Sequence, residues 1–99
     1  MNQLTSLELK EWMASGKDFL LVDIREDIER EAYHIGGDHI PMGDLVSRLD
    51  AMPKDKDIVL YCEKGIRSVI AIQRLEAFGF NNLFNLSGGM KAWKQMQQP

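Results

Sequence analysis

The residues best suited to chemistry in this sequence form one short stretch, residues 62–68, between an apolar strand pattern and a helical one. In order they are Cys62, Glu63, Lys64, Gly65, Ile66, Arg67 and Ser68. A short glycine-containing loop that opens a helix gathers backbone N–H groups, and the positive end of the helix dipole also attracts an anion. Lys64 and Arg67 add positive charge. The stretch therefore predicts a nucleophilic thiolate inside a cradle that also accepts an anionic substrate.

A second interpretation treats Cys62 as a small apolar residue buried at the end of a core strand. It is the only cysteine of the chain. A core cysteine needs no neighbouring glycine, cations or helix start, so these neighbours favour the reactive thiol. The residues alone leave both interpretations open.

Three motifs resemble those of the rhodanese-like sulfurtransferases, in the same order and over nearly the whole chain. Residues 62–68 are similar to the active-site loop of that family, C-x-x-G-x-R-S. Residues 21–25 are similar to its D-x-R stretch, and residues 86–93 to its L-x-G-G-x-x-A-W ending. The resemblance implies a rhodanese-like fold, in which the active loop follows the fourth strand of a five-stranded sheet.

The resemblance also implies sulfur transfer of the thiosulfate sulfurtransferase type. Cys62 would take the outer sulfur of a donor such as thiosulfate, carry it as a persulfide, and pass it to a thiol or cyanide acceptor. This double displacement predicts ping-pong kinetics. It needs no cofactor. The partners would be a small anionic sulfur donor and a thiol or sulfur-accepting protein.

Two other functions remain as alternatives. The chain could be a sulfur-carrier or regulatory module that a partner protein loads, with little small-molecule turnover. It could also be a phosphatase or arsenate reductase, but such relatives place five residues between cysteine and arginine, whereas four separate Cys62 from Arg67 here. A single cysteine also forms no internal disulfide, so a thiol outside the chain must release the sulfur.

The loop residues receive separate expectations. Gly65 would allow the backbone to turn its N–H groups inward. Arg67 would hold an anionic donor or pair with a carboxylate, for which Asp23 and Glu26 are candidates. Asp23 and Arg25 follow an apolar strand pattern, and the resemblance places them beside the loop in a supporting role.

The other charged and polar loop residues each have two interpretations. Lys64 would bind departing sulfite or be an exposed lysine. Glu63 disfavours an anionic donor and suits a protein partner with basic groups. Ser68 would either donate a hydrogen bond to sulfur or satisfy backbone groups at the helix start.

Length and composition predict one domain over residues 1–99, with no nucleic-acid or membrane partner. The chain has 99 residues, a net charge of −3 and 44% apolar residues. Neither charge nor any long apolar run favours binding to nucleic acid or insertion into a bilayer. The first residues do not resemble a signal peptide, and a lone cysteine suits a reducing compartment, so we expect a cytoplasmic protein.

Strand and helix patterns alternate, which predicts an α/β fold with a parallel sheet covered by helices on both faces. Thr5 and Glu8 form a capping box for a helix over residues 6–14, whose buried stripe would be Leu9, Trp12 and Met13. Strands are expected at 19–22, 58–61 and 83–86. Further helices are expected at 26–32, 45–52, 68–78 and from 89 onward, with residues 97–99 frayed.

Two positions within these elements carry further expectations. Phe78 would lie on the buried face of the helix over 68–78. His34 and His39 have neither the spacing nor the additional ligands of a metal site, so no metal is expected.

Overall fold

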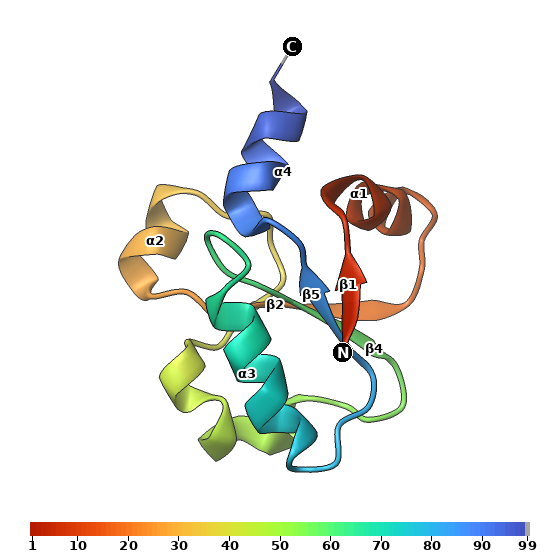
Figure 1. Cartoon of the computed structure of the whole chain (residues 1–99), viewed down its shortest axis with the longest axis vertical. Coiled ribbons are helices and arrows are strands. Elements are labelled where there is room, and N and C mark those ends of the chain that lie inside the picture. The colour runs from red at the N-terminus through yellow and green to blue at the C-terminus, as the bar shows by residue number, and fades with distance from the viewer. Residues whose placement is uncertain (99) are drawn as a thin grey trace.

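The computed structural model describes residues 1–98, which form an α/β fold (Figure 1). In chain order the elements are β1 Asn2–Leu4, α1 Ser6–Ala14, β2 Phe19–Asp23, α2 Asp27–Ala32, β3 Asp38–His39, the 3-10 helices η1 Met42–Asp44 and η2 Val46–Ala51, β4 Asp57–Tyr61, α3 Arg67–Glu76, β5 Leu83–Leu86 and α4 Gly89–Gln97.

The five strands form one parallel sheet in the order β1-β5-β4-β2-β3. In the register of β2 with β4, Asp23 lies opposite Tyr61, and Leu60 of β4 lies opposite Asn85 of β5. Because parallel strands all end at the same edge, Asp23, Cys62 and the end of β5 meet there. Ligands of open α/β sheets bind at this edge.

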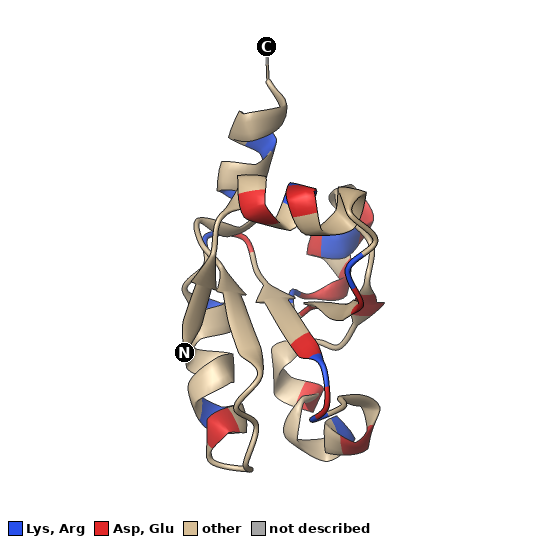
Figure 2. Ribbon diagram, turned by 90° about the vertical axis from the view of Figure 1, so that its right-hand side faces the viewer, with Lys and Arg blue, Asp and Glu red and all other residues tan. Residues whose placement is uncertain are grey.

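Alternate residues of the strands face two separate apolar clusters. Leu60 of β4 packs with Ile72 and Leu75 of α3 and with residues of the η1–η2 segment. Val59 of β4 packs on the other face, with residues of α1 and α4 such as Leu9. The predicted parallel sheet with helices on both faces is confirmed. Charged residues lie mainly on the helices and connecting loops (Figure 2).

The local signals around the first helix are confirmed, with one exception. The Thr5 hydroxyl accepts a hydrogen bond from Glu8 N–H at 3.1 Å, and the Glu8 carboxylate accepts one from Thr5 N–H at 3.0 Å. Leu9 is fully buried, and Trp12 packs edge-on against the rings of Phe19 and Phe84. Met13 is 39% exposed, so its predicted place in the buried stripe is wrong.

The helix predicted over residues 45–52 is a pair of 3-10 segments instead. Arg48 has φ −128° and ψ 36°, which interrupts any regular helix, although Leu45 and Met52 still reach the core. Phe78 is 46% exposed because α3 ends before it, so the predicted spacing no longer applies. Gln97 is the last residue of α4, whereas Pro99 lies outside the described residues.

The sequence patterns did not predict two of the strands. β1 has three residues and β3 has two, too few for a periodicity to be read. β1 nevertheless pairs along its whole length with β5. Across residues 1–98, no helix combines the length and apolar character needed to span a bilayer.

Candidate active site

Cys62 follows β4 and is held by the start of α3. Its Sγ accepts hydrogen bonds from Gly65 N–H at 3.1 Å and from Ser68 N–H at 3.4 Å, and it lies 3.3 Å from Ser68 Oγ. The Cys62 residue is 1% exposed. Backbone N–H groups that converge on a sulfur favour a negative charge there, so the loop forms the predicted cradle.

The loop backbone is shaped by Gly65 and by α4. Gly65 has φ +83°, and a Cβ on it would lie 3.0 Å from Gly88 N, so a larger residue fits poorly. On the other side of the loop, Met90 N–H donates to Cys62 O at 3.0 Å and Lys91 N–H donates to Glu63 O at 2.9 Å. A trans peptide points its C=O and N–H in opposite directions. Because the carbonyls of Cys62 and Glu63 point toward the first turn of α4, the N–H groups of the same two peptides point away from it.

A polar chain that the sequence analysis missed lies behind the sulfur. The Ser68 hydroxyl donates to Asn85 Oδ1. The Asn85 amide group donates to Gly65 O at 3.3 Å and to Gln3 Oε1 at 2.9 Å. Asn85 is 3% exposed, and a polar residue inside the apolar pattern of β5 was the available signal. This chain fixes the position of the Ser68 hydroxyl beside the sulfur.

A cavity of about 350 Å³ opens in front of the sulfur. Its lining residues are Glu29, Cys62, Glu63, Lys64, Ile66 and Arg67. Five of the seven loop residues singled out by the sequence therefore line one cavity. Gly65 and Ser68 contribute hydrogen bonds to the sulfur, and Ile66 is 64% exposed at the rim.

Arg67 pairs with a carboxylate that the sequence did not identify. Its Nη1 donates to Glu29 Oε1 at 2.8 Å and its Nη2 to Glu29 Oε2 at 2.7 Å. The expected partners, Asp23 and Glu26, are therefore wrong. The hydrogen bonds from Arg67 lower the pKa of Glu29 from its usual 4.5 to about 2. Glu29 is on α2, 38 residues from Arg67 in the sequence, so spacing carried no signal for the pair.

Asp23 and Arg25 form a buried ion pair beside the cavity rather than in it. Arg25 Nε and Nη2 each donate to the Asp23 carboxylate at 3.0 Å, and Arg25 N–H also donates to it at 3.0 Å. Burial alone would raise the pKa of Asp23, but these bonds and the charge of Arg25 outweigh it and lower that pKa. The supporting role that the resemblance implied for Asp23 and Arg25 stays a prediction.

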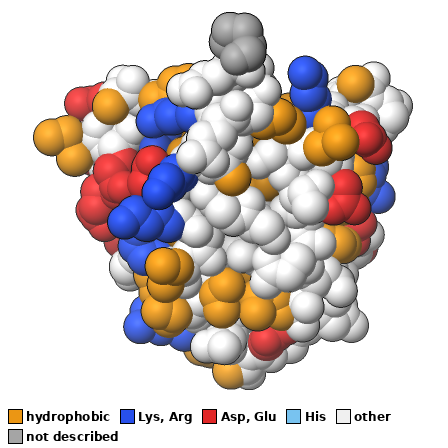
Figure 3. All heavy atoms as spheres, turned by 45° about the horizontal axis from the view of Figure 1, so that its top comes forward, with side chains coloured by type: hydrophobic (Ala, Val, Ile, Leu, Met, Phe, Trp, Pro, Cys, Tyr) orange, Lys and Arg blue, Asp and Glu red, His pale blue; other side chains and the backbone are white. Residues whose placement is uncertain are grey.

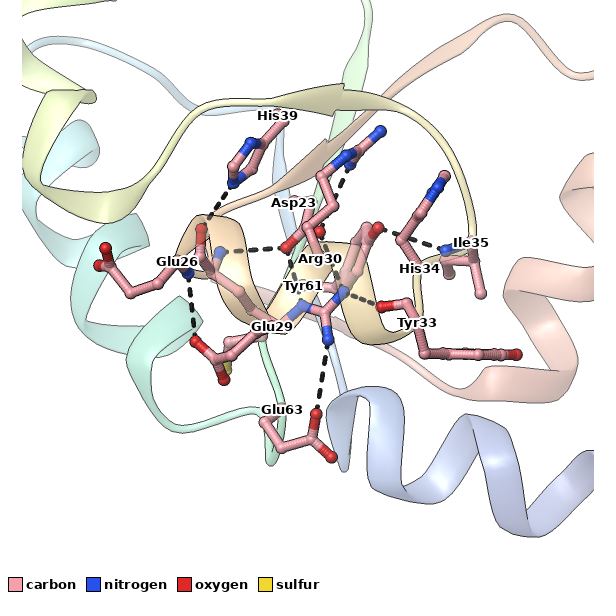
Figure 4. Close-up of polar contacts among 12 residues, drawn as sticks. Asp23, Glu26, Glu29, Arg30, Tyr33, His34, Ile35, His39, Tyr61 and Glu63 are labelled. Atoms are coloured by element: carbon pink, nitrogen blue, oxygen red, sulfur yellow. Dashed lines mark hydrogen bonds and ion pairs between the residues drawn. The ribbon is translucent and has the colours of Figure 1, made fainter.

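The Arg25 guanidinium also joins the cysteine loop to α2. It donates to Tyr33 O at 2.5 Å and lies 3.5 Å from a Glu63 carboxylate oxygen (Figure 4). The Tyr61 ring lies under the guanidinium, 5.4 Å from it, and burial raises the pKa of Tyr61 to about 12. Neither Tyr61 nor Tyr33 was singled out by the sequence.

His34 and His39 line a second cavity of about 270 Å³, with Asp27, Arg30 and Glu31. His39 Nε2 is 2.7 Å from Arg25 O, and His34 Nδ1 accepts from Gly36 N–H at 3.0 Å. Among residues 1–98, no group of three or more histidine, cysteine or acidic side chains is arranged to hold a metal ion.

One edge of the sheet thus carries the cysteine cradle, the ion pair of Asp23 with Arg25, and the start of α4. A family model described as the rhodanese-like domain matches residues 5–96. The chain belongs to the rhodanese-like domain family. A crystal structure of a rhodanese-like domain protein from Staphylococcus aureus aligns with a TM-score of 0.87 and 33% identity, over 94% of this chain and 91% of that one.

Relatives of this rhodanese-like domain have sulfur-transfer names. It is 36% identical to a sulfurtransferase of Allochromatium vinosum, over 100% of this chain and 94% of that protein. It is 34% identical to the probable adenylyltransferase/sulfurtransferase MoeZ of Mycobacterium tuberculosis, over 97% of this chain. The match covers only 25% of MoeZ.

Proposed function

We propose that this rhodanese-like domain transfers sulfane sulfur through a persulfide on Cys62. The observation that carries the proposal is the convergence of Gly65 N–H and Ser68 N–H on the Cys62 sulfur, at 3.1 and 3.4 Å, behind an open cavity. A terminal sulfur on Cys62 would extend into this cavity. The names of the relatives support the same chemistry.

The transfer would proceed in two displacements. The Cys62 thiolate attacks the outer sulfur of a donor such as thiosulfate, the donor S–S bond breaks, and sulfite leaves with the bonding electron pair. A thiolate or cyanide acceptor then attacks the outer sulfur of the persulfide, and Cys62 leaves as the thiolate. The loop N–H groups stabilise negative charge on sulfur in both steps. Lys64 lines the cavity through which sulfite would leave.

Intact-mass measurement tests the proposal directly. Wild type incubated with thiosulfate should gain about 32 Da, one sulfur, and a reducing thiol should remove it. The Cys62→Ser variant should gain nothing. If no sulfane donor adds sulfur to wild type, sulfur transfer is refuted and Cys62 becomes a structural core residue.

A second candidate is a sulfur carrier that a partner protein loads. Two features favour it: Arg67 is already bound to Glu29, and Ile66 is 64% exposed at the cavity rim, where a protein surface would cover it. A carrier would gain sulfur slowly from thiosulfate and quickly from a persulfidated protein. We propose the cytoplasm for either function, because a reducing compartment keeps a lone thiol free.

A further inference from the structure

We propose that Glu29 selects the sulfur donor by the donor's charge. By occupying Arg67, it disfavours a dianion such as thiosulfate and favours the persulfide of a thiol, which has one negative charge or none at the reacting end. The inference rests on the proposed sulfur transfer through Cys62 and adds a residue that selects the donor.

The geometry leaves Arg67 little freedom to bind an anion. Its two terminal nitrogens donate to the two oxygens of Glu29, at 2.8 and 2.7 Å, which is the strong bidentate arrangement of arginine with carboxylate. Glu29 is itself fixed, because Glu26 N–H donates to the same carboxylate at 3.1 Å (Figure 4). A thiosulfate that reached Arg67 would have to displace this carboxylate.

The charges of the cavity lining also cancel. Two carboxylates, Glu29 and Glu63, lie in the lining with two cations, Lys64 and Arg67. With its pKa lowered to about 2, Glu29 is ionised at neutral pH. Figure 3 shows acidic and basic side chains side by side on one face of the molecule. A lining with no net charge gives a dianion no net electrostatic attraction.

Lys64 is the one remaining lining cation, since no ion pair within residues 1–98 includes it. The lining thus holds this lysine and two carboxylates, and one of these, Glu63, lies 3.5 Å from Arg25 Nη1. The exposed Ile66 side chain supplies an apolar surface in the same lining. This combination suits the carbon skeleton of a thiol persulfide better than a sulfonate group.

The favoured reaction balances without another reactant. The Cys62 thiolate attacks the outer sulfur of R–S–SH, and the S–S bond of the donor breaks. R–S⁻ leaves with the electron pair, and the outer sulfur with its proton remains on Cys62. The leaving group has one charge, whereas thiosulfate releases doubly charged sulfite, so the persulfide needs no free arginine.

The test compares Glu29→Gln with Glu31→Gln. Both changes remove one carboxylate from α2, but Glu31 lines the second cavity and has no bond to Arg67. Sulfur loading of each full-length protein is timed by intact mass at pH 7 and low salt. The donors are thiosulfate and the persulfide of 2-mercaptoethanol, prepared in situ.

Glu29→Gln should load from thiosulfate about tenfold faster than wild type and change by less than about twofold with the persulfide, because only the dianion gains from the lost carboxylate. Glu31→Gln should match wild type with both donors. Equal changes with both donors in Glu29→Gln, or no change with thiosulfate, would overturn the assignment. Failure of wild type to load from either donor would instead refute the sulfur transfer itself.

A salt series on wild type keeps the proposal testable if Glu29→Gln does not fold. At 0.1 M salt, exposed charges more than about 10 Å apart are largely screened from one another. A cavity that opposes dianions predicts that loading from thiosulfate stays constant or accelerates as salt rises. If salt slows it, the cavity attracts the dianion and the proposal is wrong.

Discussion

Gly89, at the start of α4, lies against the backbone of the cysteine loop. Replacing it with alanine should disturb both segments. Gly89 has φ +55°, and an added Cβ would lie 2.4 Å from Cys62 O and 2.7 Å from Glu63 O. A Cβ does not approach other atoms closer than 3.0 Å, so the Cys62 carbonyl must retreat by about 0.6 Å, the difference between 3.0 and 2.4 Å. The retreat weakens the two hydrogen bonds from α4 to the loop.

The cost has two parts. An L-residue in the left-handed region costs about 1–2 kcal/mol, and each weakened hydrogen bond from α4 to the loop costs about 1 kcal/mol. The free energy of unfolding should therefore fall by about 3 kcal/mol in Gly89→Ala. Gly16→Ala is the matched control, since Gly16 has φ +73° and nothing within 4 Å of its added Cβ. The control has only the first of these costs, so it should lose about 1–2 kcal/mol.

Urea unfolding and intact-mass timing measure the two consequences. At roughly 4–8 °C per kcal/mol, Gly89→Ala should also melt about 15–20 °C below wild type. The displaced loop should slow sulfur loading from a thiol persulfide by about tenfold or more, because a small misplacement of catalytic groups has large effects on rate. Gly16→Ala should load at the wild-type rate. Equal stabilities for the two variants would show that α4 does not hold the loop.

Three further changes test two ion pairs and one buried hydroxyl around the site. Asp23→Asn should lower the free energy of unfolding by about 3 kcal/mol, because it leaves the Arg25 guanidinium buried and short of a charge partner; a loss below about 1 kcal/mol in urea would contradict this. The pKa of Glu29 is lowered from 4.5 to about 2, so its pair with Arg67 stabilises the folded state fully above about pH 4.5 and loses that effect as pH falls toward 2. After solvent screening we expect about 1 kcal/mol, which urea titrations of wild type and Glu29→Gln should show at pH 7 and not near pH 2. Tyr61→Phe removes two hydrogen bonds of the hydroxyl and should cost about 1–2 kcal/mol of stability, with sulfur loading unchanged.

The residues of the candidate site form two groups: those close together in the sequence, and those that come from distant parts of it. Cys62, Gly65 and Ser68 lie within seven consecutive residues, so a strand end, a glycine turn and a helix start suffice to bring them together. The resemblance to a known family rested on such contiguous motifs. Glu29 and Asn85 could not be found this way, because each reaches the loop from another element, 38 residues from Arg67 and 17 residues from Ser68.

The same division holds for the fold. Helical and strand periodicities are local, so they predicted α1, α3 and the three longer strands together with their parallel arrangement. β1 exists only because Asn2–Leu4 pairs with β5, some 80 residues away, at the open edge of the sheet. The η1–η2 segment has helical spacing, yet it packs as short 3-10 turns over the face that α3 covers. Local residue order thus specified most of the elements and the candidate nucleophile. The charge in front of the sulfur and the polar chain behind it depend on long-range packing, because only packing brings α2 and β5 to the loop.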